Sequence, residues 1–419
     1  MKLQGAISKI ILVLLAITVG MGFYVGQTET QKRRTIKQEK LAHQAEVKAK
    51  FASTIITNDE ATLYRYVNSD FQPAGKVAKD TFLELNESKN LGETDYFSLK
   101  NIEGYYLNYQ EVSIPDENTV KPFVDQRYKS LIPFNQNVIT DNKTNLYDFD
   151  GNIYVSLDRG QEFKLIVNAD DKYGVDYLDH LLWINKSEAN LVAADNSSAP
   201  IAREVRTLCY HKLYDENVNY CGSVICHELG QMRSHFDYLK NNGYYFMSMQ
   251  DMAWWLKGQI QIPYNSVCLT FDDGGDNTVL LVALLNEYQI HATLFLIGSI
   301  YYEGMNSNYL ELQSHTYDLH HAKECSIGRG SALVCRGDDE VIADLTKSKE
   351  LTNAIAFCYP YFQYTSHLKS LVQQVGFQLA FGGNIGLIDQ GDDPYTLSRY
   401  ECSSSTSVDE MAHQLHEDY

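Results

Sequence analysis

The sequence lacks the excess of basic residues that a nucleic-acid-binding protein needs. Its 419 residues include 54 acidic and 35 basic side chains, which gives a formal net charge of −19 at pH 7. A basic patch or stripe is the electrostatic footprint of nucleic-acid binding, so we exclude nucleic acid as a partner. The length predicts two or three domains and is sufficient for a sizeable core.

The N-terminal apolar run lacks a cleavage signal. Residues 10–25 are mostly apolar, with no A-x-A-like site after them, and the run is slightly shorter than the ~20 residues of a comfortable transmembrane helix. We interpret residues 1–26 as an uncleaved signal-anchor that spans the cell membrane once, with the catalytic domain outside the cell. Cleavage and secretion is the alternative. Basic residues are more numerous after the run than before it, so charge does not settle the orientation.

Cysteine is absent before residue 200, and no C-x-x-C pair occurs, so a structural zinc site is not indicated. The eight cysteines after residue 200 permit disulfides in an exported chain. We favour a bond between Cys325 and Cys335, which flank a glycine-containing loop, and Cys221 with Cys226 is the second candidate pair. Cysteines in the apolar runs, such as Cys358, are as readily interpreted as buried free thiols.

The first half of the chain contains an internal repeat. Residues 61–64 recur as 144–147, and 81–85 recur as 162–166, with an offset of about 80 residues. Short alternating strands with polar turns predict a small β-barrel for each copy. The pattern resembles bacterial SH3-like modules, which often bind cell-wall material, and a structural spacer is the alternative. The expected order is a polar stalk at 27–56, repeat 1 at 57–115, a linker at 116–140, repeat 2 at 141–194 and a linker at 195–206.

From Arg206 onward, strand patterns alternate with helix patterns. Such alternation predicts a parallel sheet or βα barrel over residues 207–419, with the active site at the carboxyl ends of the strands. The predicted strands are 207–210, 244–249, 267–271, 292–297, 355–359 and 378–381, and the predicted helices are 227–242, 252–258, 277–288, 338–351 and 366–375.

Two clusters in this region carry chemistry. An apolar run ends in Thr270-Phe271-Asp272-Asp273-Gly274, and about forty residues later the chain has His315, His320 and His321. One carboxylate and two imidazoles make the three-ligand set of catalytic zinc, which leaves a position for water. The other aspartate is then available as a base. A plainer interpretation makes the two aspartates a strand-end pair that caps the next helix.

These clusters are similar to those of a known family. Residues 270–274 match its T-F-D-D-G motif, 314–320 resemble its histidine-pair motif, and 356–361 resemble its third motif in the Tyr-Pro-Tyr form. On this basis residues 207–402 resemble the polysaccharide deacetylases, the NodB-type family also called carbohydrate esterase family 4. The family fold is a distorted (β/α) barrel. Cys209-Tyr210-His211 upstream resembles the permuted branch that deacetylates exported poly-N-acetylglucosamine.

The resemblance implies a role for each motif residue. Asp273, His315 and His320 would hold a divalent metal, with zinc expected first and cobalt, nickel or iron as alternatives. His321 is a second choice for the place of His320. Asp272 would take a proton from water as general base.

Three further residues complete the implied site. His211 would protonate the leaving amine, and the backbone N–H of Tyr361 would stabilise the oxyanion. The family arginine that contacts the base is missing from the third motif, so Arg399 would supply that charge. Phe362 stands where the family commonly has glycine, and His416 is a weaker alternative to His211 as the acid.

The implied function is a metal-dependent hydrolase. It would remove N-acetyl groups from N-acetylglucosamine residues of a cell-surface polysaccharide, either poly-N-acetylglucosamine or peptidoglycan. One alternative is a catalytically silent cell-wall glycan-binding protein, which Phe362 and the missing motif arginine allow. Another is an O-acetyl esterase acting on a polysaccharide. The implied partners are the glycan, the cell wall through the repeats, and the membrane through the N-terminal segment.

Overall fold

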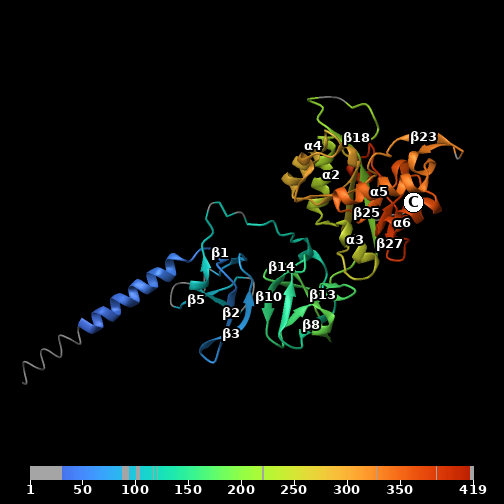
Figure 1. Cartoon of the computed structure of the whole chain (residues 1–419). Helices are drawn as coiled ribbons and strands as arrows, with labels where there is room; N and C mark the ends of the chain where they lie inside the picture. The colour runs from blue at the N-terminus through green and yellow to red at the C-terminus, as the bar shows by residue number, and fades with distance from the viewer. Residues whose placement is uncertain are drawn as a thin grey trace, which may run out of the picture. The chain divides into compact units, whose positions relative to one another are not determined.

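The computed structural model describes residues 31–86, 94–100, 104–116, 118–119, 121–218, 221–326, 328–383 and 385–415. The expected signal-anchor lies outside these residues. Residues 31–49, within the expected stalk, form a helix (Figure 1). Among the residues that are described, no helix combines the length and hydropathy of a membrane span.

The chain divides into two compact units, which do not follow the expected repeat boundaries. Unit 1 comprises residues 1–122 and 143–158, and unit 2 comprises residues 123–142 and 159–419. The expected second repeat is therefore divided, because residues 143–158, near its start, group with the first repeat. Its remainder groups with the C-terminal region.

Unit 1 is an antiparallel β unit. Six of its strands pair in the order β9-β10-β3-β2-β6-β5, and β4-β1-β7 form a small second sheet. Alternate residues of these short strands are buried, as expected for sheets with one face on a core. The strands are β1 (Thr54–Thr57), β2 (Ala61–Val67), β3 (Asp70–Val77), β4 (Phe82–Glu84), β5 (Tyr96–Ser98), β6 (Tyr105–Asn108), β7 (Val112–Ser113), β9 (Thr144–Tyr147) and β10 (Ile153–Leu157).

The strands from β8 to β15 repeat the element order of β1 to β7, and all of them except β9 and β10 belong to unit 2. The trio β11-β8-β15 has the same pairing as β4-β1-β7, and a short 3-10 turn precedes the last strand in both copies. The sequence repeat thus reappears in the order of the elements. The strand β8 lies inside residues 116–140, which were expected to be a linker. The strands are β8 (Gln136–Thr140), β11 (Glu162–Lys164), β12 (Val167–Asn168), β13 (Lys172–Tyr177), β14 (His180–Asn185) and β15 (Ala189–Ala193).

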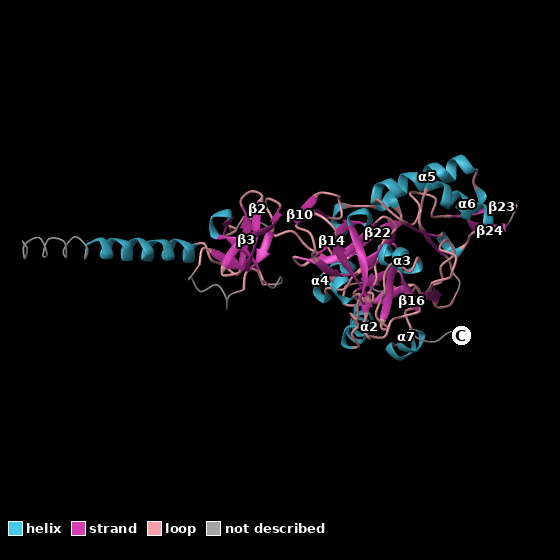
Figure 2. Ribbon diagram, turned by 90° about the horizontal axis from the view of Figure 1, so that it is seen from below, coloured by secondary structure: helices cyan, strands magenta, loops and turns pink. Residues whose placement is uncertain are grey.

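The rest of unit 2 is a parallel sheet covered by helices (Figure 2). Its main strands are hydrogen-bonded in the order β26-β25-β22-β21-β20-β16, all parallel. The strands are β16 (Glu204–Tyr210), β17 (Lys212–Tyr214), β18 (Cys226–Glu228), β19 (Tyr245–Phe246), β20 (Ser266–Asp273), β21 (Ala292–Leu296), β22 (Leu310–Ser314), β23 (Ala322–Cys325), β24 (Gly328–Ser331), β25 (Ala356–Cys358), β26 (Leu379–Phe381), β27 (Ile388–Asp389) and β28 (Tyr400–Glu401). The helices are α2 (Leu229–Asn241), α3 (Met249–Leu256), α4 (Thr278–Tyr288), α5 (Asp338–Thr352), α6 (Ser366–Val375) and α7 (Val408–Gln414).

The sheet curls so that one short segment bridges its two edges. Leu397 pairs with Phe381 of β26, and Tyr400 of β28 pairs with Leu208 of β16. Arg399 lies between these two contacts and therefore enters the interior of the curled sheet. The expectation of a barrel is met in this form, a curled parallel sheet whose edges are joined by residues 397–401.

Candidate active site

The strand β20 delivers both aspartates to the carboxyl edge of the sheet. Its residues are buried from Ser266 through Asp272, as expected for a central parallel strand. At its end Asp273 has a φ of 73° and Gly274 a φ of 86°. A left-handed conformation is rare for a non-glycine residue and is often found where a site demands it. This turn presents the two adjacent carboxylates in different surroundings.

Three expected ligands converge at this edge. The Nε2 atoms of His315 and His320 lie 3.7 and 3.3 Å from Oδ1 of Asp273, and one donor atom from each residue falls within 4.8 Å of the others. Two imidazoles and a carboxylate are a donor set that suits a catalytic zinc or a similar divalent ion.

The surroundings of His315 fix its orientation. His315 follows β22, and its Nδ1–H donates a hydrogen bond of 2.8 Å to the carbonyl oxygen of Cys358. Nε2 is thereby left directed at Asp273, in the arrangement that metal-ligating histidines usually have. Burial lowers the pKa of His315 to about 4, so the ring is neutral at pH 7, as a ligand must be.

The loop that carries His320 is held by a carboxylate. Oδ1 of Asp344, on α5, accepts a hydrogen bond from the backbone N–H of Tyr317, and Oδ2 accepts those of Asp318 and Leu319. The ring of His320 stacks on that of Tyr361 with centroids 5.1 Å apart.

His321 takes a different direction from its neighbour. Its Nδ1–H donates to the carbonyl oxygen of Asp318 at 3.4 Å. His321 does not belong to the group of possible metal ligands that Asp273 forms with the other two histidines. The geometry therefore favours His320 over His321 as a ligand.

Asp272 lies next to the candidate metal ligands, with its Oδ2 4.0 Å from Nε2 of His315, and it pairs with Arg399. The guanidinium Nη1 and Nη2 donate to the two carboxylate oxygens at 2.7 and 2.8 Å, and both side chains are buried. Burial by itself would raise the pKa of Asp272, but the adjacent Arg399 guanidinium holds the pKa of that carboxyl well below its usual value. Such a two-point contact fixes the carboxylate plane.

Two thiols also contact Asp272, and these contacts were not predicted from the sequence, where both cysteines simply stand in apolar runs. Sγ of Cys358 lies 3.5 Å and Sγ of Cys209 lies 3.8 Å from Oδ2 of Asp272. Arg399 Nη2 donates to Sγ of Cys358 at 2.9 Å. Both cysteines sit at the ends of strands, Cys358 at the end of β25 and Cys209 near the end of β16, and strand-end position at the same edge as Asp272 is the signal that could have identified them.

His211 also reaches this part of the site. A donor atom of His211 lies within 4.8 Å of donor atoms of Cys209 and Asp272. Its Nδ1 is buried without a hydrogen-bond partner among the described residues. The weaker candidate for the acid, His416, lies outside the residues described.

The third motif forms a strained turn next to Arg399. Tyr361 and Phe362 both have left-handed φ values, 57° and 55°. Tyr361 is 53% exposed, and the Phe362 ring lies 5.0 Å from the Arg399 guanidinium. A cation over a ring face is attracted by the ring quadrupole. Phe362 thus covers the arginine that orients Asp272.

The disulfides agree with the expectation. Cys325 is bonded to Cys335, and Cys221 to Cys226. Cys209, Cys268, Cys358 and Cys402 are buried free thiols.

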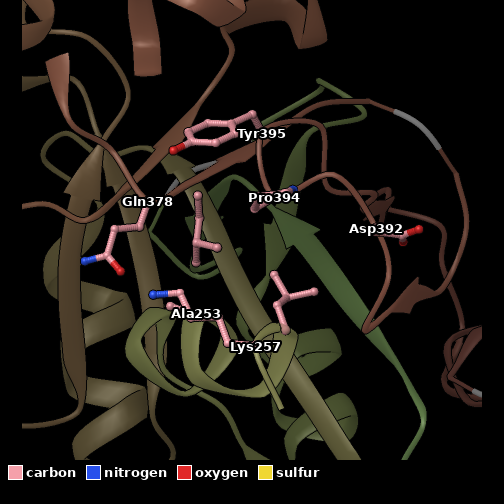
Figure 3. Close-up of a pocket in the computed structure, with 8 residues that line it drawn as sticks. Ala253, Lys257, Gln378, Asp392, Pro394 and Tyr395 are labelled. Carbon is pink, nitrogen blue, oxygen red and sulfur yellow. The ribbon is translucent and has the colours of Figure 1, made fainter. Parts of the chain in front are cut away.

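A cavity of about 250 Å³ lies elsewhere (Figure 3). Leu379 in its wall is the first residue of β26, so the cavity lies toward the amino end of that strand, whereas the site described above occupies the carboxyl edge. Its lining is Ala253, Leu256, Lys257, Gln378, Leu379, Asp392, Pro394 and Tyr395. None of the expected site residues contributes to it.

Comparisons with known proteins agree with the motifs. Residues 261–380 match the family model described as polysaccharide deacetylase. No curated protein matches the sequence.

Several solved structures are similar to parts of the chain. The deacetylase PplD from Streptococcus pyogenes is 18% identical (TM-score 0.43) over 51% of this chain and 99% of that one. A de-N-acetylase from Aggregatibacter actinomycetemcomitans is 20% identical (TM-score 0.43), with 50% and 99% covered. IcaB from Ammonifex degensii is 22% identical (TM-score 0.43), with 52% and 99% covered.

The matched residues 261–380 include the aspartate pair, the histidine pair and the Tyr-Pro-Tyr turn. The chain is therefore similar to the polysaccharide deacetylase family over residues 261–380, the part that holds most of the candidate site.

Proposed function

We propose that the chain is a divalent-metal-dependent N-deacetylase. Its substrate would be the N-acetylglucosamine residues of a cell-surface polysaccharide, either poly-N-acetylglucosamine or peptidoglycan. The observation that carries the proposal is the convergence of His315 and His320 on Asp273, 3.7 and 3.3 Å away, next to a second carboxylate fixed by Arg399.

The donor set fits a metal on chemical grounds. His315 is neutral and oriented by its bond to Cys358, and Asp273 supplies a charge that partly balances a dication. A bound divalent metal lowers the pKa of water from ~15.7 toward ~7 and polarises an acyl carbonyl. Zinc is the first expectation, and cobalt, nickel or iron are the alternatives.

The remaining chemistry falls to the chain's own side chains. Asp272, ionised and held in one plane by Arg399, accepts the proton of the attacking water. His211 gives a proton to the departing amine, because the unprotonated nitrogen would have to leave as an anion and is a poor leaving group. The backbone N–H of Tyr361 stabilises the oxyanion, a contribution of roughly 2.7–4 kcal/mol where such donors have been removed.

The structure weakens the case for a silent binding protein. That alternative rested on Phe362 and on the arginine missing from the third motif. Arg399 reaches Asp272 from residues 397–401, and Phe362 packs against that arginine. An O-acetyl esterase would use the same groups, because acyl transfer from oxygen also needs an activated water and an oxyanion site.

Acetate release tests the proposal. The purified chain should release acetate from poly-N-acetylglucosamine or peptidoglycan, chelation should stop it, and added divalent metal should restore it. Asp272→Asn should retain metal and lose turnover. Acetate release that survives complete removal of metal would contradict the scheme, and release from acetylated xylan alone would favour the esterase.

The cellular location is also a proposal. We infer that residues 1–26 anchor the chain in the membrane with both units outside the cell, where the repeats contact wall material. The two disulfides support an oxidising compartment. Protease treatment of intact cells should digest the chain, and full protection would refute this orientation.

A further inference from the structure

The outer face of one sheet in unit 1 is aromatic. Five side chains from β2, β3, β5 and β6 form a connected cluster, here called the aromatic patch. Phe71 is at its centre, with ring centroids 3.9 Å from Tyr96, 4.9 Å from Tyr66 and 5.1 Å from Tyr106. Tyr64 completes the patch at 4.9 Å from Tyr96.

The strand register places these rings on one face. Tyr66 is directly opposite Phe71, and Tyr64 is directly opposite Tyr106. The alternate residues Leu63 and Leu107 point to the other face and are fully buried. In an antiparallel sheet with one face on a core, the outer face is normally polar. The patch therefore departs from what folding alone requires.

The patch is both accessible and rigid. Tyr66 is 54% exposed, and the other four rings are half-buried. Phe71 and Tyr96 stack nearly parallel, with planes 15° apart. Rings that are already held by their neighbours lose little conformational freedom when a ligand covers them. An exposed apolar cluster of this kind is typical of a binding surface.

A carboxylate with spare bonding capacity lies beside the patch. Oε1 of Glu111 accepts the backbone N–H of Thr62 at 3.1 Å, whereas Oε2 is buried and has no hydrogen-bond partner among the described residues. Thr62 lies two residues before Tyr64 on β2, so its bond to Glu111 brings that carboxylate close to the patch, and burial and the nearby Glu111 raise the pKa of Tyr64. An unsatisfied buried acceptor favours a ligand that brings a donor.

We propose that the aromatic patch is a second glycan site, which binds glucosamine polymer carrying free amino groups. The inference rests on the proposed function, because such a polymer is the product of N-deacetylation. Pyranose rings have apolar C–H faces that cover aromatic rings, and their hydroxyl edges meet the tyrosine hydroxyls. The ammonium groups of the product complement Glu111.

Charge argues for this polymer over a neutral glycan. The chain carries a formal net charge of −19, and a polycation is drawn to such a chain before any specific contact forms. Retention of partly deacetylated polymer on unit 1 raises the effective concentration of its remaining acetylated residues. The site would then act on long chains and have no effect on short ones.

Binding is tested with full-length chain that carries Asp272→Asn, so that turnover does not change the polymer. Affinity is measured for partly deacetylated glucosamine polymer, fully acetylated polymer and a neutral glucan. Phe71→Ala and Tyr66→Ala should each weaken binding of the deacetylated polymer about tenfold. Glu111→Gln should remove the preference for it over the glucan. Phe149→Ala, an exposed aromatic in the turn after β9, is the matched control and should bind normally.

Several outcomes would overturn the inference. One is an unchanged affinity of the patch variants for the deacetylated polymer. Another is an equal affinity of the unmodified patch for that polymer and for the neutral glucan. A patch variant that alters only the oligomeric state would assign the patch to a second copy of the chain. Tyr66 is more than half exposed, so its variant should fold, and circular dichroism checks this.

Acetate release from a short N-acetylglucosamine oligomer separates the two proposals. The patch variants, with Asp272 intact, should release acetate from it at the normal rate while their KM for long polymer rises. If the unmodified chain releases no acetate from any glycan, the proposed function fails, and the binding series still decides whether the patch holds glucosamine polymer.

Discussion

At the scale of single residues, the site is built from side chains whose chemistry depends on what surrounds them. Asp272 and Asp273 are adjacent in sequence, yet one is buried against Arg399 and the other faces two imidazoles. The left-handed φ of Asp273 separates them. Their different surroundings suit one carboxylate to orient water and the other to bind a cation.

The neighbouring histidines give a matched test of the metal site. His320→Ala should weaken zinc binding by more than the ~10–100-fold that loss of an outer-shell partner costs, because a donor beside Asp273 disappears. His321→Ala should bind zinc normally, because that ring bonds to Asp318 instead. Calorimetric titration of metal-free chain measures both, and a reversed order would exchange the two assignments.

The thiol of Cys358 gives a second residue-scale prediction. It contacts both Arg399 and Asp272, so Cys358→Ala should lower kcat about tenfold while metal content stays unchanged. Cys358→Ser replaces the thiol with a hydroxyl that can also donate a hydrogen bond, so this variant should recover most of the rate. Cys268→Ala, equally buried on β20, is the control for loss of a buried thiol. Equal losses in the two alanine variants would show that only packing matters.

Sequence reasoning identified the residues of the site better than their partners. Asp273, His315 and His320 stand in recognisable motifs, and the structure brings them together. The thiols of Cys209 and Cys358 could not be assigned, because a cysteine in an apolar strand has the same pattern whether or not its sulfur meets a carboxylate. That contact depends on strands from distant parts of the chain.

At the scale of elements, the strongly periodic segments were predicted well. The helices expected at 277–288 and 338–351 are α4 and α5 to within one residue at each end. The strand β22, which positions His315, was not expected. Its sequence Leu310-Glu311-Leu312-Gln313-Ser314 contains polar residues that are satisfied inside the fold: Thr293 donates to Glu311, and the backbone N–H of Ala356 donates to Gln313. Local pattern cannot show such long-range partners.

The turn after β20 gives an element-scale prediction. A Cβ on Gly274 would lie 2.7 Å from Cδ1 of Leu296, and its φ is +86°. Gly274→Ala should therefore destabilise the chain by about 1–3 kcal/mol through overpacking in addition to backbone strain, and should weaken metal binding at Asp273.

The matched control for that turn is Gly258→Ala. Gly258 has a similar φ of +69°, but a Cβ there meets nothing within 4 Å, so only the backbone strain applies. Urea denaturation compares the two variants. If they lose equal stability, the contact with Leu296 is irrelevant and strain alone explains both.

At the scale of the whole molecule, the domain pattern in the sequence and the compact units differ for a physical reason. The repeat is visible in the order of the elements. However, β10 of the second copy pairs with β3 of the first copy in the antiparallel sheet of unit 1. Strand pairing between distant segments decides which residues form one unit. A repeat boundary in the sequence therefore does not have to be a boundary in space.

Stability of the whole chain should depend on pH through buried histidines. Burial lowers the pKa of His227 to about 4 and also lowers the pKa of His235, whereas an unfolded histidine titrates near ~6.5. Between these pH values the unfolded chain binds protons that the native chain does not. Acid therefore favours unfolding. The free energy of unfolding keeps its full value above pH ~6.5 and decreases as the pH falls toward 4. The decrease due to His227 reaches up to about 3 kcal/mol.

The measurement is a series of urea denaturations from pH 4 to pH 7. The free energy of unfolding should fall with decreasing pH in the native chain, and His227→Gln should reduce the slope in this window, because the variant has no imidazole to protonate at that position. His367→Gln is the control, since His367 is an exposed residue that meets Asp338 at the surface. If the His227→Gln variant and the native chain show the same slope of unfolding free energy against pH, other groups drive acid unfolding. The burial of the His227 ring is then irrelevant to it.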